Sequence, residues 1–100
     1  MSEVIRMHLT YTLVLLPDAE GGYVVEVPAL PGCTTHGKTL SEALLMAEDA
    51  IGGYLSVLIE DGDDIPREQA GVEVKLGRKR EALLRKVTVA LPVEEAAGLA

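Results

Sequence analysis

The stretch GGYVVEVPALPGCTTHGKTLSEAL, residues 21–44, carries the strongest structural signals in the chain. Residues 23–27 are rich in β-forming side chains and predict a strand. Pro28 and Pro31 end this strand, because proline has no N–H to donate to a sheet, and Gly32 permits a turn where a Cβ would clash. Residues 33–37 predict a short strand. The stretch therefore indicates two strands joined by a tight corner, with a helix to follow.

A long helix begins at the end of this stretch. Thr39 and Glu42 have the spacing of a capping box, with Thr39 at the N-cap and Glu42 reaching back from the third helical position. Gly52 and Gly53 lie inside the helix, where close approach of another backbone or a kink would explain them. The segment EDGDD, residues 60–64, ends the helix. One apolar stripe contains Leu40, Leu44, Ala47, Ile51, Tyr54 and Leu58, and a second, a candidate subunit contact, contains Met46, Ala50, Gly53 and Val57.

Three further segments have the alternation of strands. Residues 9–15 place Leu9, Tyr11, Leu13 and Leu15 on one side, and residues 72–76 and 87–91 also alternate. Residues 78–86 predict a short basic helix. We therefore expect an α+β fold: a β-β-β-α-β two-layer unit with one long helix packed on a small, mainly antiparallel sheet, plus a short C-terminal αβ extension. The main domain is placed at residues 1–77 and the extension at residues 78–100.

Composition limits the classes of protein to which the chain can belong. It has 100 residues, of which 48% are hydrophobic and 25% charged, so we expect one soluble domain with an aliphatic core. No apolar run approaches the roughly 18 residues of a membrane span, and the N-terminus lacks the pattern of a secretory signal. A single cysteine excludes an internal disulfide and suits a reducing compartment. We expect a cytoplasmic protein with no membrane segment.

Charge is distributed unevenly along the chain. Residues 1–74 carry 13 acids and 3 bases, whereas residues 75–86 carry 6 bases and 1 acid. An acidic body suits a basic partner and repels nucleic acid, so the basic segment is the candidate contact for nucleic acid or for another subunit. Its bases are Lys75, Arg78, Lys79, Arg80, Arg85 and Lys86.

Residues 21–44 resemble the signature of HicB-like antitoxins. That signature has a Gly-Tyr strand, a Pro-x-x-Pro-Gly-Cys corner, a Gly-x-Thr step and a Glu-Ala helix start. With the neighbouring strand and helix, the resemblance covers residues 9–60. The matching residues, to which we assign a structural role, are Gly22, Tyr23, Pro28, Leu30, Pro31, Gly32, Cys33, Thr35, Gly37, Thr39, Glu42 and Ala43.

The resemblance implies a partial RNase H-like fold without nuclease activity. It also implies a partner, a small RNA-cleaving toxin of the HicA type, whose active site the antitoxin covers. Many members of the family add a C-terminal DNA-binding domain. Here the segment KVTVALPVEEAAGLA, residues 86–100, looks like the opening strand and first helical turn of a ribbon-helix-helix, which leaves operator binding open. A second departure is Ala29, which stands where the family often has aspartate.

Cys33 and His36 raise the question of catalysis or metal binding. Positions three apart on a strand point to opposite faces, and no third group is evident to orient the histidine. Zinc usually requires four ligands in a structural site, whereas the chain offers His8, Cys33 and His36. A metal-dependent nuclease needs clustered carboxylates, and Glu26 is the one acid in the first three predicted strands. We therefore expect no catalytic residues, no metal and no cofactor.

The residues Gly32, Gly37, Lys38 and Thr39 formally match a phosphate-binding loop. Such a loop follows a buried parallel strand in a large α/β sheet, whereas two prolines precede this one in a chain of 100 residues. The leading hypothesis is thus a non-catalytic antitoxin that binds a small basic toxin, as a homodimer or a higher oligomer. The alternative is a stand-alone oligomeric regulator that binds nucleic acid through residues 75–86.

Overall fold

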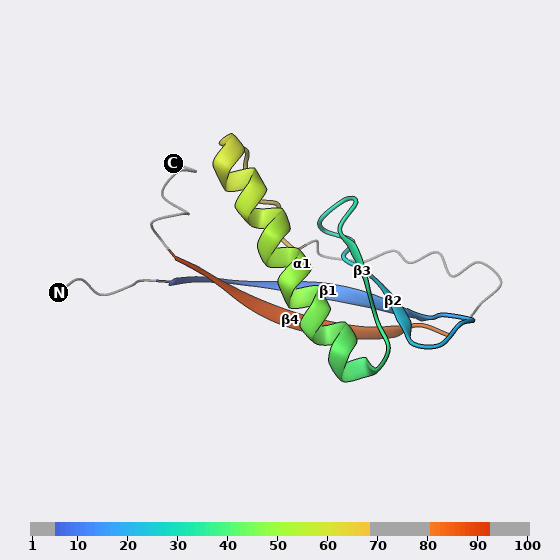
Figure 1. Cartoon of the computed structure of the whole chain (residues 1–100). Helices are drawn as coiled ribbons and strands as arrows, with labels where there is room; N and C mark the ends of the chain where they lie inside the picture. Colours follow the sequence, from blue (N-terminus) through green and yellow to red (C-terminus); the bar gives the residue numbers. More distant parts are fainter. Residues whose placement is uncertain (1–5, 69–80, 93–100) are drawn as a thin grey trace.

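The computed structural model describes residues 6–68 and 81–92, and its elements follow the order β-β-β-α-β. The strands form one antiparallel sheet in the order β3-β2-β1-β4, and the helix lies across one face of it (Figure 1). The expected α+β fold, with one long helix on a small antiparallel sheet, is confirmed. The elements are β1 (Arg6–Pro17), β2 (Tyr23–Glu26), β3 (Thr34–Gly37), α1 (Leu40–Asp61) and β4 (Leu83–Pro92).

Strand β1 connects the two halves of the sheet. Its C-terminal end pairs with β2, from Val14 opposite Glu26 to Pro17 opposite Tyr23. On the other side β4 pairs with nearly the whole of β1, ending at Leu15 opposite Leu83. Because β2 is short, the first half of β1 pairs with β4 alone among the described residues. Strand β3 extends the sheet on the far side of β2.

The core lies between α1 and the sheet. Tyr11, Leu13 and Leu15 are fully buried on the face that α1 covers, as predicted, but Thr12 and Val14 between them are buried too, so burial itself does not alternate over residues 11–15. Strand β4 adds Val87, Val89 and Leu91. The helix contributes the buried line Ala43, Ala47, Ile51 and Leu55, with Leu40, Leu44, Tyr54 and Leu58 partly buried beside it. The first predicted stripe is thus part of the packed side of α1.

Both ends of α1 have the residues that the sequence indicates. The Thr39 hydroxyl accepts a hydrogen bond from the Glu42 N–H at 3.1 Å, and the Glu42 carboxylate accepts one from the Lys38 N–H at 3.3 Å. At the C-terminal end Gly62 has a φ of 74°, a left-handed conformation that glycine adopts without strain. In the part of the chain that the structure describes, no helix combines the length and the apolar character needed to cross a bilayer.

The segment after α1 is attached to two neighbouring residues of β1. The Tyr11 hydroxyl donates to the main-chain carbonyl of Pro66 at 2.5 Å, and the Thr12 hydroxyl donates to the carboxylate of Glu68 at 2.5 Å. Neighbouring residues of a strand point to opposite faces, so residues 66–68 contact side chains from both faces of β1. This attachment lies beside the half of β1 that β2 does not reach.

The C-terminal part of the chain differs from the expectation. The short basic helix predicted for residues 78–86 is wrong over residues 83–86, which belong to β4. The strand therefore begins four residues before the predicted run at 87–91. Leu83 and Leu84 pair with Leu15 and Val14, and these sheet contacts outweigh the helix propensity of EALLRK, residues 81–86. The strand predicted at 72–76, residues 78–80 and the boundary between residues 77 and 78 lie outside the described residues.

Candidate functional site

The proline-glycine corner between β2 and β3 is a compact turn held by main-chain hydrogen bonds. The Leu30 N–H donates to the Val27 carbonyl at 3.0 Å, the Cys33 N–H donates to the Leu30 carbonyl at 2.9 Å, and the Val27 N–H donates to the Cys33 carbonyl at 3.2 Å. From α1, the Tyr54 hydroxyl donates to the Pro31 carbonyl at 2.8 Å. The corner is therefore attached to the helix, and these main-chain groups bond within the protein.

Two glycines of the signature lie where backbone segments meet. Gly22, with a φ of 78°, lies against β3, and an added Cβ would stand 2.4 Å from the Gly37 carbonyl oxygen. On Gly37 an added Cβ would stand 2.3 Å from the backbone nitrogen of Ala43, in the first turn of α1. The hairpin loop, β3 and the start of α1 are thus in close contact, which requires side chains no larger than hydrogen at these two positions. Nearby, Ala29 is buried, so a methyl group fills the place where the family often has aspartate.

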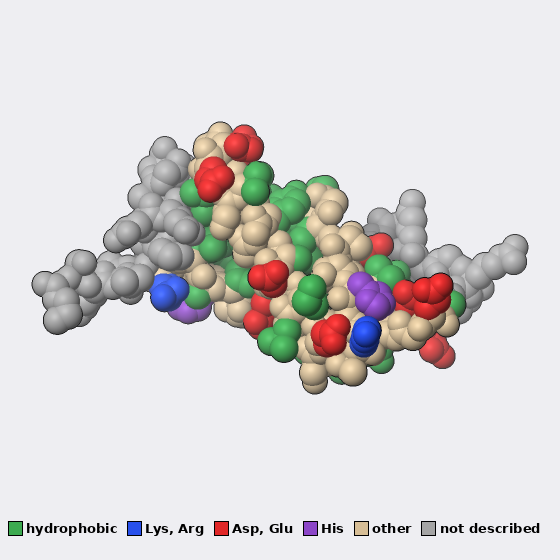
Figure 2. Space-filling view, viewed as in Figure 1, with side chains coloured by type: hydrophobic (Ala, Val, Ile, Leu, Met, Phe, Trp, Pro, Cys, Tyr) green, Lys and Arg blue, Asp and Glu red, His purple; other side chains and the backbone are tan. Residues whose placement is uncertain are grey.

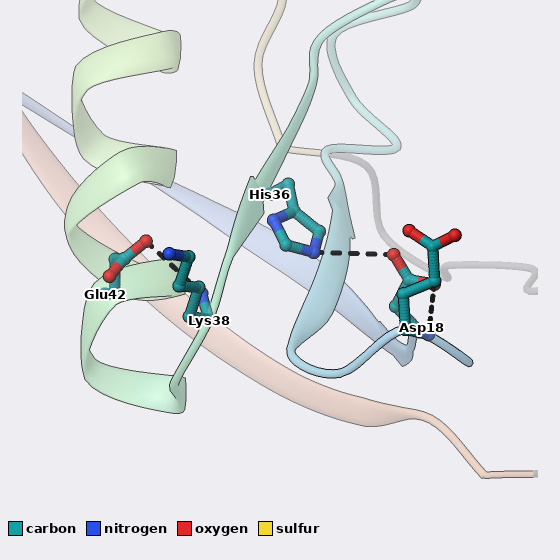
Figure 3. Close-up of polar contacts among 5 residues, drawn as sticks. Asp18, His36, Lys38 and Glu42 are labelled. Atoms are coloured by element: carbon teal, nitrogen blue, oxygen red, sulfur yellow. Dashed lines mark hydrogen bonds and ion pairs between the residues drawn. The ribbon is translucent and has the colours of Figure 1, made fainter.

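The structure separates Cys33 from His36. Cys33 is a free thiol in the core, 6% exposed, and burial raises its pKa. His36 is exposed on β3, and its Nε2 lies 3.4 Å from the Asp18 carboxylate in the loop after β1 (Figure 3). A nucleophilic cysteine needs a lowered pKa and a neighbouring base. This pair offers neither, because the thiol faces the core and the imidazole faces the hairpin loop.

The formal phosphate-loop residues do not form a phosphate-binding loop. Residues 34–36, between its glycines, and the second glycine, Gly37, form strand β3, whereas a phosphate loop needs an open turn whose N–H groups face the ligand. The following N–H groups also have partners: Glu42 donates to the Thr39 hydroxyl, and Lys38 donates to the Glu42 carboxylate (Figure 3). A carboxylate at this position repels a phosphate.

The histidines, the cysteine and the acids do not form a metal centre in the described ranges, where no group of three or more such side chains has suitable geometry. His8 lies on β1 opposite Ala90, away from the corner that contains Cys33. A polar hollow of about 310 Å³ lies beside the His36–Asp18 contact. Its lining residues are Asp18, Glu20, Gly21, Gly22, His36 and Lys38.

The outer side of α1 combines exposed apolar and charged side chains. Met46 and Val57, both from the second predicted stripe, are 41% and 55% exposed. Leu45, which belongs to neither predicted stripe, is 66% exposed. Figure 2 shows hydrophobic and acidic side chains interspersed along α1. Periodicity did not identify Leu45, because this residue stands outside both predicted apolar stripes. Its position between acidic residues of α1 was the sequence signal that could have identified it as an exposed apolar side chain.

The structure describes two of the six bases in the candidate contact segment. Arg85 and Lys86 are exposed on β4, and Lys86 stands opposite Thr12 in the sheet. Because successive residues of a strand face opposite sides, these two neighbouring cations point in different directions. The other four, Lys75, Arg78, Lys79 and Arg80, lie outside the described residues.

Comparison with known proteins relates this structure to one family. The family model for HicB-like antitoxins of bacterial toxin-antitoxin systems matches residues 11–92. A UPF0150 protein of Thermoplasma acidophilum is 47% identical over 62 residues, which cover 62% of this chain and 90% of that protein. Antitoxin HicB of Escherichia coli K12 is 36% identical over 58 residues, which cover 58% of this chain and 42% of the antitoxin. The chain thus matches less than half the length of this named antitoxin.

The fold agrees with the same relationship. The crystal structure of the N-terminal domain of Burkholderia pseudomallei antitoxin HicB has a TM-score of 0.67 and 28% identity, over 83% of this chain and 100% of that domain. The family match extends from β1 to the end of β4 and includes the corner and the whole of α1. The chain belongs to the family of HicB-like antitoxins of bacterial toxin-antitoxin systems.

Proposed function

We propose that this chain binds a small, basic, RNA-cleaving toxin of the HicA type and neutralises it by covering its active site. The observation that carries the proposal is the match of residues 11–92 to an antitoxin family. The similarity to the N-terminal domain of antitoxin HicB supports assigning the antitoxin role to this α+β unit. The partner is thus a protein.

Charge supports a basic partner. The net charge of the chain is −7, and α1 contains five acids, Glu42, Glu48, Asp49, Glu60 and Asp61, and neither lysine nor arginine. Complementary charge accelerates encounter between two proteins and disfavours partners of the same sign. An RNA-cleaving protein must itself attract a polyanion, so its substrate-binding surface is basic and suits an acidic inhibitor.

The proposal is for a binding protein that catalyses no reaction. Two observations support it: burial raises the pKa of the Cys33 thiol, and the imidazole of His36 contacts Asp18 instead of that thiol. Neutralisation then requires only that the complex be more stable than the complex of toxin and RNA. A stoichiometric inhibitor of this kind loses activity once its Kd rises to about its working concentration.

We also infer a cytoplasmic protein that forms a homodimer or a higher oligomer, with a partial RNase H-like fold. Strands β3 and β4 are the edges of the described sheet. An unpaired edge offers N–H and carbonyl groups to another chain, and β4, at ten residues, is the longer edge. Three antiparallel strands followed by a helix and a fourth strand are compatible with the RNase H-like assignment.

The test of the proposed function is co-expression of this chain with the small basic protein encoded beside its gene. The two proteins should copurify as a complex, and the complex should cleave RNA far more slowly than the free toxin. Retention of full RNase activity by a saturated complex, or failure of the two purified proteins to bind, would refute the proposed function.

Nucleic-acid binding through residues 75–86 is the second candidate. Exposed Arg85 and Lys86 on β4 favour it, because exposed cations bind phosphates without sequence preference. A gel-shift assay should then detect a complex with operator DNA that is lost when Arg78, Lys79 and Arg80 are replaced by alanine. Absence of any shift at low salt would refute this candidate and leave the antitoxin proposal intact.

A further inference from the structure

The side of α1 that faces away from the sheet exposes large apolar side chains. Leu45 is 66% exposed, Met46 41% and Val57 55%. Met46 and Val57 are eleven residues apart, close to three helical turns, so they lie on one line along the helix. A helix packed on a sheet normally places polar residues on this side. Large exposed apolar side chains on one line indicate a contact with another macromolecule.

An acidic row runs beside these apolar side chains. Glu42, Asp49 and Glu60 are exposed, and their separations of seven and eleven residues correspond to about two and three turns. Leu45 lies on one side of the row, and Met46 and Val57 lie on the other. No lysine or arginine of α1 neutralises the row, because α1 contains none. Figure 2 shows the resulting mixture of acidic and hydrophobic side chains over α1.

Gly53 lies on the same line as Met46 and Val57 and is exposed. Glycine destabilises a helix relative to alanine, and two common reasons for retaining it are absent here. Its φ is not positive, and, apart from its chain neighbours and the adjoining backbone of α1, no described atom lies within 4 Å of the place that a Cβ would occupy. The fold of the described residues therefore does not require Gly53, whereas an approaching backbone would benefit from the space.

We propose that the outer face of α1, formed by Leu45, Met46, Val57, Glu42, Asp49 and Glu60, is the surface that contacts the basic toxin. This inference rests on the proposed function and assigns its binding surface. The occupant must present cations to the acidic row and apolar side chains to the positions on either side of it. A second copy docked through the same face would bring like charges together, and nucleic acid would be repelled. A basic protein surface with apolar side chains between its cations satisfies both requirements.

One matched pair of variants tests the charges. Asp49→Lys reverses a charge on the outer face, and Glu26→Lys reverses one on β2, where the exposed side chain stands opposite Thr34. Both change the net charge equally, so any effect of overall charge is shared. With the full chain and the basic protein encoded beside the gene, Asp49→Lys should raise the Kd about tenfold or more. Glu26→Lys should change it by less than about threefold.

A second pair tests the apolar contacts. Val57→Arg and Leu84→Arg place the same side chain at similarly exposed apolar positions, 55% and 53%, on α1 and β4 respectively. Val57→Arg should raise the Kd about tenfold or more, whereas Leu84→Arg should leave it nearly unchanged. Thermal unfolding of each variant without toxin provides a control for folding. If Val57→Arg fails to fold, the Asp49→Lys and Glu26→Lys pair still decides the matter.

The outcomes separate this inference from the proposed function. Selective loss of affinity in the α1 variants, with toxin neutralisation by the unaltered chain, supports both. If the unaltered chain neutralises the toxin and the sheet variants lose affinity as much as or more than the α1 variants, the assigned surface is wrong and the proposed function stands. If the unaltered chain does not bind the toxin, the proposed function falls, and the surface assignment falls with it.

Discussion

Gly37 in β3 lies so close to Ala43 in α1 that an added Cβ on Gly37 would stand 2.3 Å from the Ala43 nitrogen and 2.4 Å from its Cα. Both of these atoms belong to the backbone, so no change of side-chain rotamer relieves the clash. The contact fixes the position of the first turn of α1 on the sheet. It also gives a physical reason for glycine and alanine at these two positions of the family signature.

We expect Gly37→Ala to destabilise the fold by about 1–3 kcal/mol or more, as overpacking of a close contact does. Urea denaturation should therefore show a lower midpoint. The additional change Ala43→Gly should not restore stability, because the clash is with backbone atoms of residue 43. Full recovery in the double variant would show that the Ala43 methyl group, and not the backbone, limits the approach.

Gly53→Ala should have the opposite effect on the free protein. Alanine is favoured over glycine in a helix interior by about 1 kcal/mol, and a Cβ at position 53 meets no described atom within 4 Å. The melting temperature should therefore rise. Gly62→Ala is the matched control and should lower it, because residue 62 has a φ of 74°. A loss of stability in Gly53→Ala would indicate that α1 requires glycine for a reason within the monomer.

The thiol of Cys33 should be unreactive in the folded protein. It is 6% exposed, and burial raises its pKa, so both access and the thiolate fraction are low at neutral pH. Modification by iodoacetamide should be slow in buffer and fast in concentrated urea. Cys33→Ala, if it folds, should still neutralise the toxin. Rapid native labelling, or a folded alanine variant without neutralising activity, would contradict a purely structural role for the thiol.

The phenol of Tyr11 should make stability depend on alkaline pH. Burial, with a smaller contribution from the Glu68 carboxylate, raises its pKa above the ordinary value of 10.0, while Arg67 acts in the opposite direction. The unfolded phenol ionises first, so the contribution to stability is complete below pH 10 and decreases as pH rises toward the folded pKa. Its hydroxyl also donates to Pro66, so Tyr11→Phe should cost about 1 kcal/mol at pH 7.

The measurement is urea unfolding at several values of pH in a Cys33→Ala background, which removes the thiol that titrates in the same range. The decline in stability above pH 10 should be smaller in Tyr11→Phe than in its parent. An equal decline in both proteins would show that the Tyr11 phenol is not the group responsible.

Local sequence signals predicted most of the elements. Alternation identified β1, the β-forming residues of 23–27 identified β2, the capping box identified Thr39 as the N-cap of α1, and the segment EDGDD marked its end. These features depend on residues within a few positions of each other, so the sequence expresses them directly. The corner was correctly placed for the same reason, since two prolines restrict the backbone and a glycine permits a turn wherever they occur.

The sequence by itself thus determined the α+β class, the corner and the boundaries of α1. Only the tertiary structure decided that residues 83–86 form a strand, because helix propensity is weak compared with pairing along β1 and burial of Leu83. It also placed Leu45 beside the acidic row of α1. These outcomes depend on which face of each strand or helix is buried in the fold. Contacts with segments distant in the sequence determine that face, and local residue preferences do not.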